Sequence, residues 1–94
     1  MRNARTDKIH KPMREALRAI GCRCADCYRH GDGFPDMFVF DPVSGRSWLV
    51  EIKSGKGTLT PAEEIFFSDF EGCEVLTIWR SIEQALATVQ EARV

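Results

Sequence analysis

The stretch PDMFVFDPVSGRSWLVEIK, residues 35–53, decides the fold of this chain. It contains two apolar runs of strand length, Met37–Phe40 and Ser47–Ile52, joined by the segment Asp41–Arg46. That segment combines aspartate, proline, serine and glycine, residues that favour a tight turn. We therefore predict that the two runs pair as an antiparallel hairpin.

The register of this hairpin follows from the turn. If Asp41 pairs with Arg46 across a four-residue loop, Asp36 lies directly opposite Glu51. Opposed residues in an antiparallel pair point to the same face of the sheet, with Cβ atoms about 5 Å apart. Lys53 lies two residues beyond Glu51 and therefore shares this face, unless a β-bulge shifts the register by one residue. The other face carries apolar side chains that can cover a core, namely Met37, Val39, Trp48, Val50 and Ile52.

Two carboxylates held opposite one another in a mostly apolar sheet repel, and a divalent cation removes this conflict. Mg²⁺ binds through one or two carboxylates and shares phosphate oxygens of a substrate. The bound ion polarises a phosphoryl oxygen, and a neighbouring lysine can orient or deprotonate the attacking water. Asp36, Glu51 and Lys53 therefore predict metal-assisted hydrolysis of a phosphodiester. The alternative is a solvated cross-strand charge cluster with no catalytic role.

The sequence before the hairpin predicts one helix and one strand. Residues 7–20 place apolar side chains at helical spacing, and Gly21 ends the helix. The helix starts either with Asp7 as N-cap or at Lys11, with Pro12 in the first helical position. Residues 22–29 predict a short strand, which leads into a loop over residues 30–33.

Helix, strand and helix are expected after the hairpin. Thr60 and Glu63 form a capping box around Pro61, and the helix that they open ends at Gly72 with inward-facing Ile65, Phe66, Phe67 and Phe70. Residues 73–79 predict a core strand, and a second capping box at residues 81–84 opens a C-terminal helix. The expected fold class is α/β, a single domain over residues 1–94 with a four-stranded mixed sheet flanked by helices in the order αβββαβα.

The motif Pro35-Asp36 followed by Glu51-Ile52-Lys53 resembles the PD-(D/E)xK nuclease superfamily. With residues 33–36, 50–53 and 59–61, the chain is most similar to the VRR-NUC branch, which includes small phage and bacterial proteins related to archaeal Holliday-junction resolvases. The resemblance runs from about Asp7 to Leu86 and implies a restriction-endonuclease-like core. It further implies that Asp36, Glu51 and the main-chain carbonyl of Ile52 hold Mg²⁺ or Mn²⁺, while Lys53 serves the water. Proteins of this type commonly act as homodimers on branched or flapped DNA.

Two positions depart from the strongest form of the family pattern. Many relatives have Glu or Gln in the first helix, where this chain has His10, and Glu15 lies on the opposite side of the helix. His10 could hold a metal-bound water, or could simply be an N-terminal histidine without such a role. Relatives also often have Gln where this chain has Glu63. Glu63 could reach the site, although its place in the capping box explains it by itself.

Charge is unevenly distributed along the chain. Residues 1–30 hold eight basic and three acidic residues, a balance of +5, whereas the whole chain carries −1. A basic N-terminal part can supply the phosphate contacts that dominate affinity for nucleic acid, or it can be a solvated helix face. The candidate DNA-binding residues are Arg2, Arg5, Lys8, Lys11 and Lys56.

Other readings of the sequence are possible. A zinc-stabilised interaction protein could use Cys22, Cys24, Cys27 and His30, although zinc is disfavoured because no second ligand pair follows. A nucleic-acid-binding module could keep the nuclease fold without turnover. No apolar run approaches the roughly 20 residues of a membrane span, and no signal-peptide pattern opens the chain, so we expect a cytoplasmic protein of a bacterium or a phage-infected cell. A homodimer could form through Phe66, Phe67, Phe70 and Trp79.

Overall fold

The computed structural model describes residues 7–27 and 30–94. It is an α/β fold in the predicted order αβββαβα. Its elements are α1 (His10–Ala19), β1 (Arg23–Asp26), β2 (Met37–Phe40), β3 (Ser47–Ile52), α2 (Pro61–Asp69), β4 (Leu76–Trp79) and α3 (Ile82–Ala92). β1 covers Arg23–Asp26 of the predicted residues 22–29, of which residues 28 and 29 lie outside the described part, and β4 starts at Leu76, later than predicted.

The strands form one four-stranded mixed sheet in the order β1-β2-β3-β4. The pairs β1–β2 and β2–β3 are antiparallel, and β4 runs parallel to β3. Met37 pairs with Val50, so the predicted hairpin register is confirmed along the whole of β2. The amide of Asp41 donates to the carbonyl of Arg46 at 2.8 Å and closes the turn. At the open end, Asp36 lies just beyond the ladder, and its amide donates to the carbonyl of Val50 at 2.8 Å.

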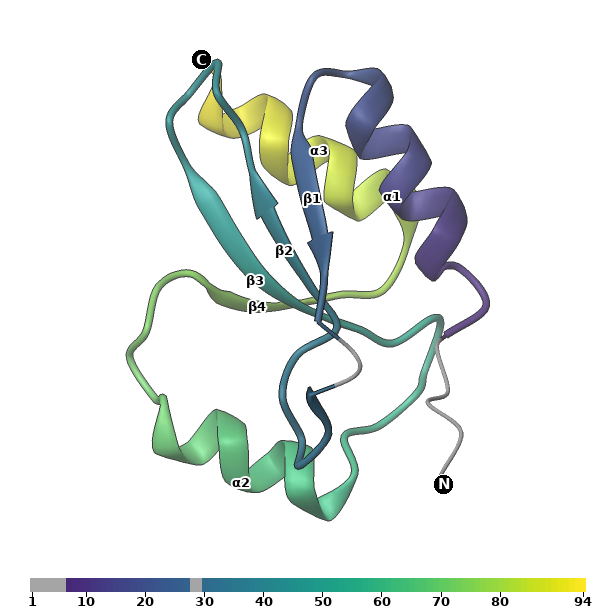
Figure 1. Ribbon diagram of the computed structural model, residues 1–94, viewed down its shortest axis with the longest axis vertical. Helices are drawn as coiled ribbons and strands as arrows, with labels where there is room; N and C mark the ends of the chain where they lie inside the picture. The colour runs from purple at the N-terminus through teal and green to yellow at the C-terminus, as the bar shows by residue number, and fades with distance from the viewer. Residues whose placement is uncertain (1–6, 28–29) are drawn as a thin grey trace.

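One face of the sheet carries the hydrophobic core. Helices α1 and α3 lie side by side over this face, whereas α2 lies apart from them at the other end of the sheet (Figure 1). The inward residues predicted for the hairpin are all buried, and they pack with residues of both helices and β4: Met13, Leu17, Met37, Val39, Trp48, Val50, Ile52, Trp79, Ala85 and Val89. Burying each large apolar side chain contributes about 1.5–3 kcal/mol, so this face carries most of the stability of the fold.

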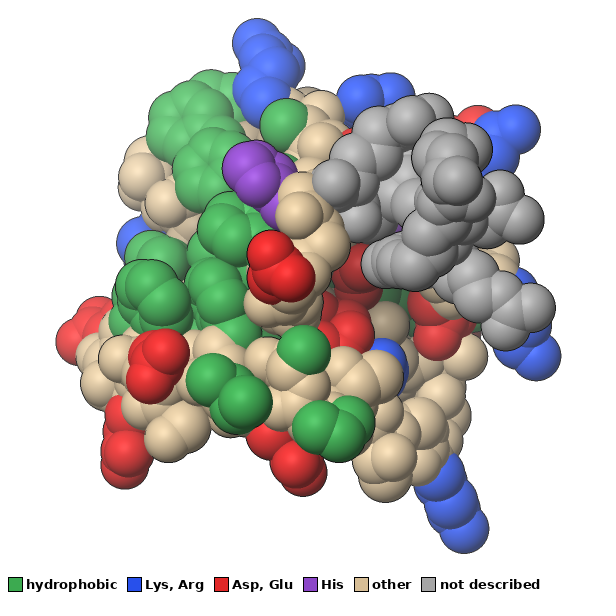
Figure 2. Space-filling view, turned by 60° about the horizontal axis from the view of Figure 1, so that its bottom comes forward, with side chains coloured by type: hydrophobic (Ala, Val, Ile, Leu, Met, Phe, Trp, Pro, Cys, Tyr) green, Lys and Arg blue, Asp and Glu red, His purple; other side chains and the backbone are tan. Residues whose placement is uncertain are grey.

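Helix α2 departs from the prediction that its apolar residues face inward. None of its residues is buried, and Ile65 and Phe70 are 64% and 49% exposed. The reason is that α1 and α3 already cover the apolar face of the sheet, so a third helix finds no core to join. Hydrophobic side chains are consequently gathered on the surface at this end of the molecule (Figure 2). Trp79 does not belong to such a surface, as proposed for a dimer, because it is 1% exposed and lies in the core.

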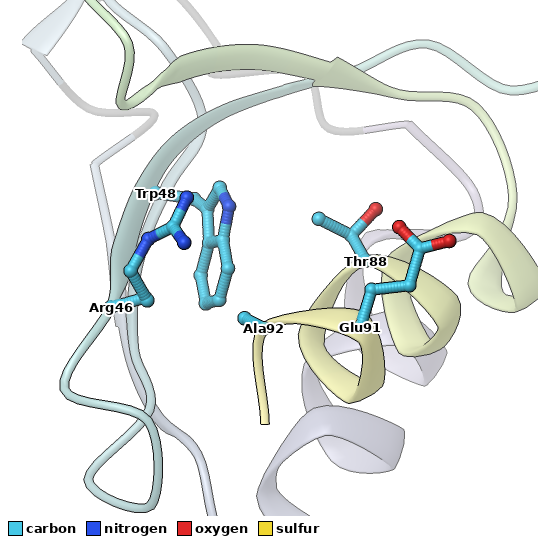
Figure 3. A pocket seen from close by; sticks show the side chains of 5 residues that line it. All are labelled: Arg46, Trp48, Thr88, Glu91 and Ala92. Carbon is cyan, nitrogen blue, oxygen red and sulfur yellow. The ribbon is translucent and has the colours of Figure 1, made fainter. Parts of the chain in front are cut away.

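Trp48 and Trp79 pack against each other with ring centroids 5.8 Å apart. Figure 3 shows the Trp48 ring opposite the last turns of α3, with the Arg46 side chain beside it. Thr88, Glu91 and Ala92 complete a pocket of about 210 Å³. Trp48 belongs to the core face of the sheet, so this pocket lies between the sheet and α3.

Asp41 ties the hairpin turn to the C-terminal helix. Its carboxylate is fully buried and accepts hydrogen bonds from Arg93 Nη2 at 2.9 Å and Nε at 3.0 Å. It also accepts from Ser44 Oγ at 2.8 Å and from the amide of Val43 at 3.1 Å. Arg93 Nη2 donates in addition to the carbonyl of Ile20 at 2.7 Å. Arg93 therefore joins the C-terminal end of α3 to the hairpin turn and to the end of α1, three segments that are distant in the sequence.

Candidate active site

Asp36, Glu51 and Lys53 come from the two strands that the sequence singles out. Asp36 immediately precedes β2, Glu51 is the fifth residue of β3, and Lys53 directly follows β3. Glu63 joins them from the first turn of α2. We call these four residues the carboxylate cluster. In Figure 2 acidic side chains gather near the centre of the face, with a basic side chain against them.

The side chains of the cluster lie within ionic contact. Lys53 Nζ is 2.9 Å from Glu63 Oε1 and 3.8 Å from Glu51 Oε2. Asp36 Oδ2 accepts a hydrogen bond from the amide of Ile52 at 2.7 Å. Because Ile52 lies between Glu51 and Lys53, this bond fixes the carboxylate of Asp36 against the strand that carries the other two residues.

Glu51 is 1% exposed, an unusual position for a carboxylate. Burial raises the pKa of Glu51 to about 9, and the neighbouring charges of Asp36 and Glu63 act in the same direction. Among the described residues, its Oε1 has no hydrogen-bond partner. A buried polar atom without a partner costs free energy and often marks a functional site. Burial of Glu51 therefore costs free energy, and a cation bound to its carboxylate would stabilise this arrangement.

Lys53 supplies the positive charge of the cluster. Burial alone would lower the pKa of Lys53, but the hydrogen bond and charge of Glu63, together with the charges of Glu51 and Asp36, raise it. Burial likewise would raise the pKa of Glu63, but the Thr60 amide and Lys53 lower it. Lys53 is consequently held as an ammonium among three carboxyl groups.

Glu63 completes the predicted capping box and also contacts Lys53. Its Oε1 accepts from the amide of Thr60 at 2.8 Å, while Thr60 Oγ1 accepts from the amide of Glu63 at 3.2 Å, so the capping box is complete. The same Oε1 lies 2.9 Å from Lys53 Nζ. The start of α2 is therefore joined directly to the candidate site.

The sequence model of the VRR-NUC domain matches residues 3–90, nearly the whole chain. This chain belongs to the VRR-NUC family. Comparisons with curated proteins and with solved structures gave no match. Membership identifies the chain as a nuclease, hence a hydrolase with a PD-(D/E)xK-like domain, in agreement with the motif that ends at Lys53. None of the helices described in residues 7–27 and 30–94 is long and apolar enough to cross a membrane.

His10, the candidate support of a metal-bound water, contacts Asp26. The ring is buried, and its Nε2 lies 2.8 Å from Asp26 Oδ1. Arg14 also pairs with Asp26. His10 thus belongs to a hydrogen-bonded network between α1 and β1. Glu15 is exposed, as expected for a residue on the solvent side of the helix.

Two residues that sequence reasoning did not assign to the site hold the loop after Lys53. Asp7 Oδ2 accepts from the amide of Ser54 at 2.7 Å and from its hydroxyl at 2.9 Å. Arg80 Nη1 donates to the carbonyls of Gly55 and Gly57 at 3.1 and 2.6 Å. Asp7 is 47 residues from Ser54, so no local sequence pattern predicts this contact. Asp7 also accepts a hydrogen bond from the amide of Ile9, directly before the helix. Helix α1 accordingly starts at His10, between the two predicted positions.

The structure describes three of the five predicted DNA-binding residues. Lys8 and Lys11 are exposed near the start of α1, and Lys56 is exposed in the loop that follows Lys53. Arg2 and Arg5 lie outside the described residues. The exposed lysines leave their ammonium groups available for phosphate contacts.

The candidate zinc ligands Cys22, Cys24, Cys27 and His30 are not gathered into one group in the part of the chain that the structure describes. Cys22 is buried in the core, and Cys27 donates to the carbonyl of Ala25 at 3.5 Å. Within residues 7–27 and 30–94, no three His, Cys, Asp or Glu side chains are arranged to hold a metal ion. This finding also covers the carboxylate cluster, in which the Lys53 ammonium is the positive group next to the carboxylates.

Proposed function

We propose that this VRR-NUC protein is a metal-dependent endodeoxyribonuclease that hydrolyses phosphodiester bonds in branched or flapped DNA. The observation that carries the proposal is the buried carboxyl of Glu51, held beside Asp36 and Lys53 with one oxygen lacking a hydrogen-bond partner among the described residues. A buried carboxyl so placed offers an oxygen to a hard cation.

The donor set of two carboxylates and one main-chain carbonyl suits a divalent ion by its chemistry, although no three His, Cys, Asp or Glu side chains of the described residues are gathered around one point. Asp36, Glu51 and the main-chain carbonyl of Ile52 would hold Mg²⁺ or Mn²⁺, both of which take oxygen ligands. When bound, the ion supplies positive charge that polarises a phosphoryl oxygen and makes a bound water more acidic. Oε1 of Glu51, which has no hydrogen-bond partner within residues 7–27 and 30–94, supports this assignment because a cation would bind it.

The remaining chemistry belongs to side chains of this chain. The Lys53 ammonium donates to a phosphate oxygen and offsets the negative charge that develops on the phosphoryl group as water attacks. Glu63 holds Lys53 in place through the 2.9 Å contact. The amide of Ile52 donates to one oxygen of Asp36 and so orients its carboxylate.

We also propose that two copies of the chain associate through the apolar surface of α2. Ile65 and Phe70 are 64% and 49% exposed, which is unusual for large apolar side chains on a helix without a partner. A two-fold pair buries the same surface on both copies. Association would bring two carboxylate clusters to one branched DNA.

A cleavage assay tests the proposed function. Linear, flapped, splayed and four-way DNAs are incubated with the protein in Mg²⁺, in Mn²⁺ and in EDTA. We expect cleavage only with a metal ion, faster on branched than on linear DNA, and lost in Asp36→Asn. Asp69→Asn, an exposed aspartate at the end of α2, is the matched control and should cleave like the wild type. DNA binding without cleavage under every condition would favour the binding-module alternative.

A further inference from the structure

An aromatic stack lies next to the carboxylate cluster, and the chemistry described so far does not use it. The rings of His30 and Phe34 have centroids 4.6 Å apart, and Phe34 meets Phe66 edge to face at 5.3 Å. Phe66 stacks on Phe70 at 4.5 Å with an interplanar angle of 18°. The stack thus joins the loop that leads to Asp36 with the exposed side of α2.

These rings border a pocket of about 290 Å³, lined by His30, Gly31, Asp32, Phe34 and Phe66. His30 and Asp32 are exposed, and Phe34 and Phe66 are half-buried, so ring surface remains open to solvent. The volume is close to the lower end of the range for ligand pockets, roughly 300 Å³. The pocket therefore has room for one flat, ring-sized group.

A close main-chain contact fixes this pocket to the catalytic residues. A Cβ atom on Gly33 would stand 2.3 Å from the carbonyl oxygen of Ala62, so only glycine allows the loop to approach the start of α2. Ala62 precedes Glu63 of the cluster, and Phe34 is two residues before Asp36. Because consecutive Cα atoms are about 3.8 Å apart, Phe34 and Asp36 are within about 8 Å of each other.

Packing alone does not account for the aromatic stack. Phenylalanine rings that serve only stability are normally buried, yet the two rings that line the pocket, Phe34 and Phe66, are only half-buried. Aromatic rings with open faces beside a phosphate-binding site are the arrangement on which unpaired bases stack in single-stranded nucleic acid. Every base has a flat π-face, so such stacking tolerates many sequences.

We propose that the aromatic pocket binds an unpaired nucleobase of the DNA, next to the phosphate engaged by the carboxylate cluster. The proposal rests on the proposed nuclease function and names the feature of the substrate that the site selects. A base inside a duplex is stacked and paired, and cannot enter the pocket without being extruded. A flap or junction offers unpaired bases at no such cost, so this pocket favours branched over linear DNA. Asp32 places a hydrogen-bond acceptor at the rim, which suits the amino groups of bases.

The test measures DNA binding by the 94-residue protein in EDTA, where we expect no cleavage. The probe is a flapped duplex with a single 2-aminopurine at an unpaired nucleotide of the junction, and its partner carries an abasic site there. We expect the wild type to quench the 2-aminopurine fluorescence and to bind the base-containing probe roughly tenfold tighter than the abasic one. Phe34→Leu and Phe66→Leu retain an apolar side chain without the ring, and should bind both probes equally. Phe40→Leu, on the exposed side of β2, is the matched control and should keep the preference.

Two results would overturn the pocket assignment. One is a full base preference in Phe66→Leu, a variant of a helix without buried residues, provided that its melting temperature matches the wild type. The other is a change of oligomeric state in Phe34→Leu with base preference intact, which would assign the rings to a protein interface. Cleavage in Mg²⁺ is scored separately: a protein that prefers the base but never cleaves refutes the nuclease proposal, whereas one that cleaves without any preference refutes only the pocket.

Discussion

Glu63 offers the sharpest test of how the fold and the site are coupled, because one oxygen serves both. Glu63→Gln keeps an acceptor for the amide of Thr60, since Gln also completes a capping box. It removes the negative charge 2.9 Å from Lys53 Nζ. Glu63→Ala removes both contacts. The two variants therefore separate the capping role from the role toward Lys53.

The expected magnitudes follow from these contacts. A charge-assisted hydrogen bond contributes about 1.5–3 kcal/mol, and Glu63 and Lys53 are largely shielded from water, with side chains 16% and 18% exposed. If about 1–2 kcal/mol of this orients Lys53 in the transition state, Glu63→Gln slows the chemical step roughly 5- to 30-fold. Glu63→Ala should slow it at least as much. It should also lower the stability by about a further 1 kcal/mol through the lost cap, or roughly 4–8 °C in melting temperature.

Single-turnover cleavage at saturating protein gives the rate, and thermal unfolding followed by tryptophan fluorescence gives the stability. Glu64→Gln is the control, because Glu64 is exposed in the same helical turn. The reasoning is refuted if Glu63→Gln cleaves at the wild-type rate. It is also refuted if the two variants have equal melting temperatures, because the capping box would then contribute nothing.

Four other results are expected. Lys53→Ala should reduce the single-turnover rate on the order of 10²-fold with nearly unchanged DNA binding, since the ammonium acts mainly in the transition state. Replacing Lys8 and Lys11 by glutamine should instead weaken binding and reduce its salt dependence by about one charge per lost phosphate contact, measured as binding isotherms at several salt concentrations. Hydrogen bonds from Arg93 outweigh the effect of burial and hold the pKa of Asp41 below its usual range. The Asp41 carboxylate therefore stabilises the fold above about pH 4, and this contribution decreases as the pH falls further. Asp41→Asn should cost roughly 2 kcal/mol in urea unfolding at neutral pH, with a gap that narrows in acid; a constant gap would contradict this. Ile65→Lys should give a monomer in light scattering at concentrations where the wild type is a dimer, and a monomeric wild type would exclude the dimer.

The cluster brings together charges that the fold must hold in place. Three carboxyl groups face one lysine, and Glu51 is almost fully buried. The fold holds them through the hairpin, through the amide of Ile52 on Asp36 and through the capping box of α2. Each of these supports includes main-chain hydrogen-bonding groups, so the positions of the carboxyl groups do not depend on contacts between flexible side chains alone.

The sequence by itself determined the hairpin, its register and the start of α2. In each case the residues that interact are close in the chain: Asp41 and Arg46 close a short turn, and Thr60 and Glu63 cap one helical turn. The alternation of side chains along a strand then follows with no information from the rest of the fold. This is why Glu51 and Lys53 were placed on one face, opposite the apolar residues of the core.

Only the tertiary structure decided how the segments meet. Asp7 binds Ser54, 47 residues away, and Asp41 binds Arg93, 52 residues away. The sequence near either aspartate does not predict its partner. The aromatic residues of α2 have the composition of a core helix, yet they are exposed because α1 and α3 already occupy the apolar face of the sheet. Whether a helix is buried depends on which apolar surfaces the other elements leave uncovered. Those surfaces are known only from the assembled fold and cannot be derived from a short stretch of sequence.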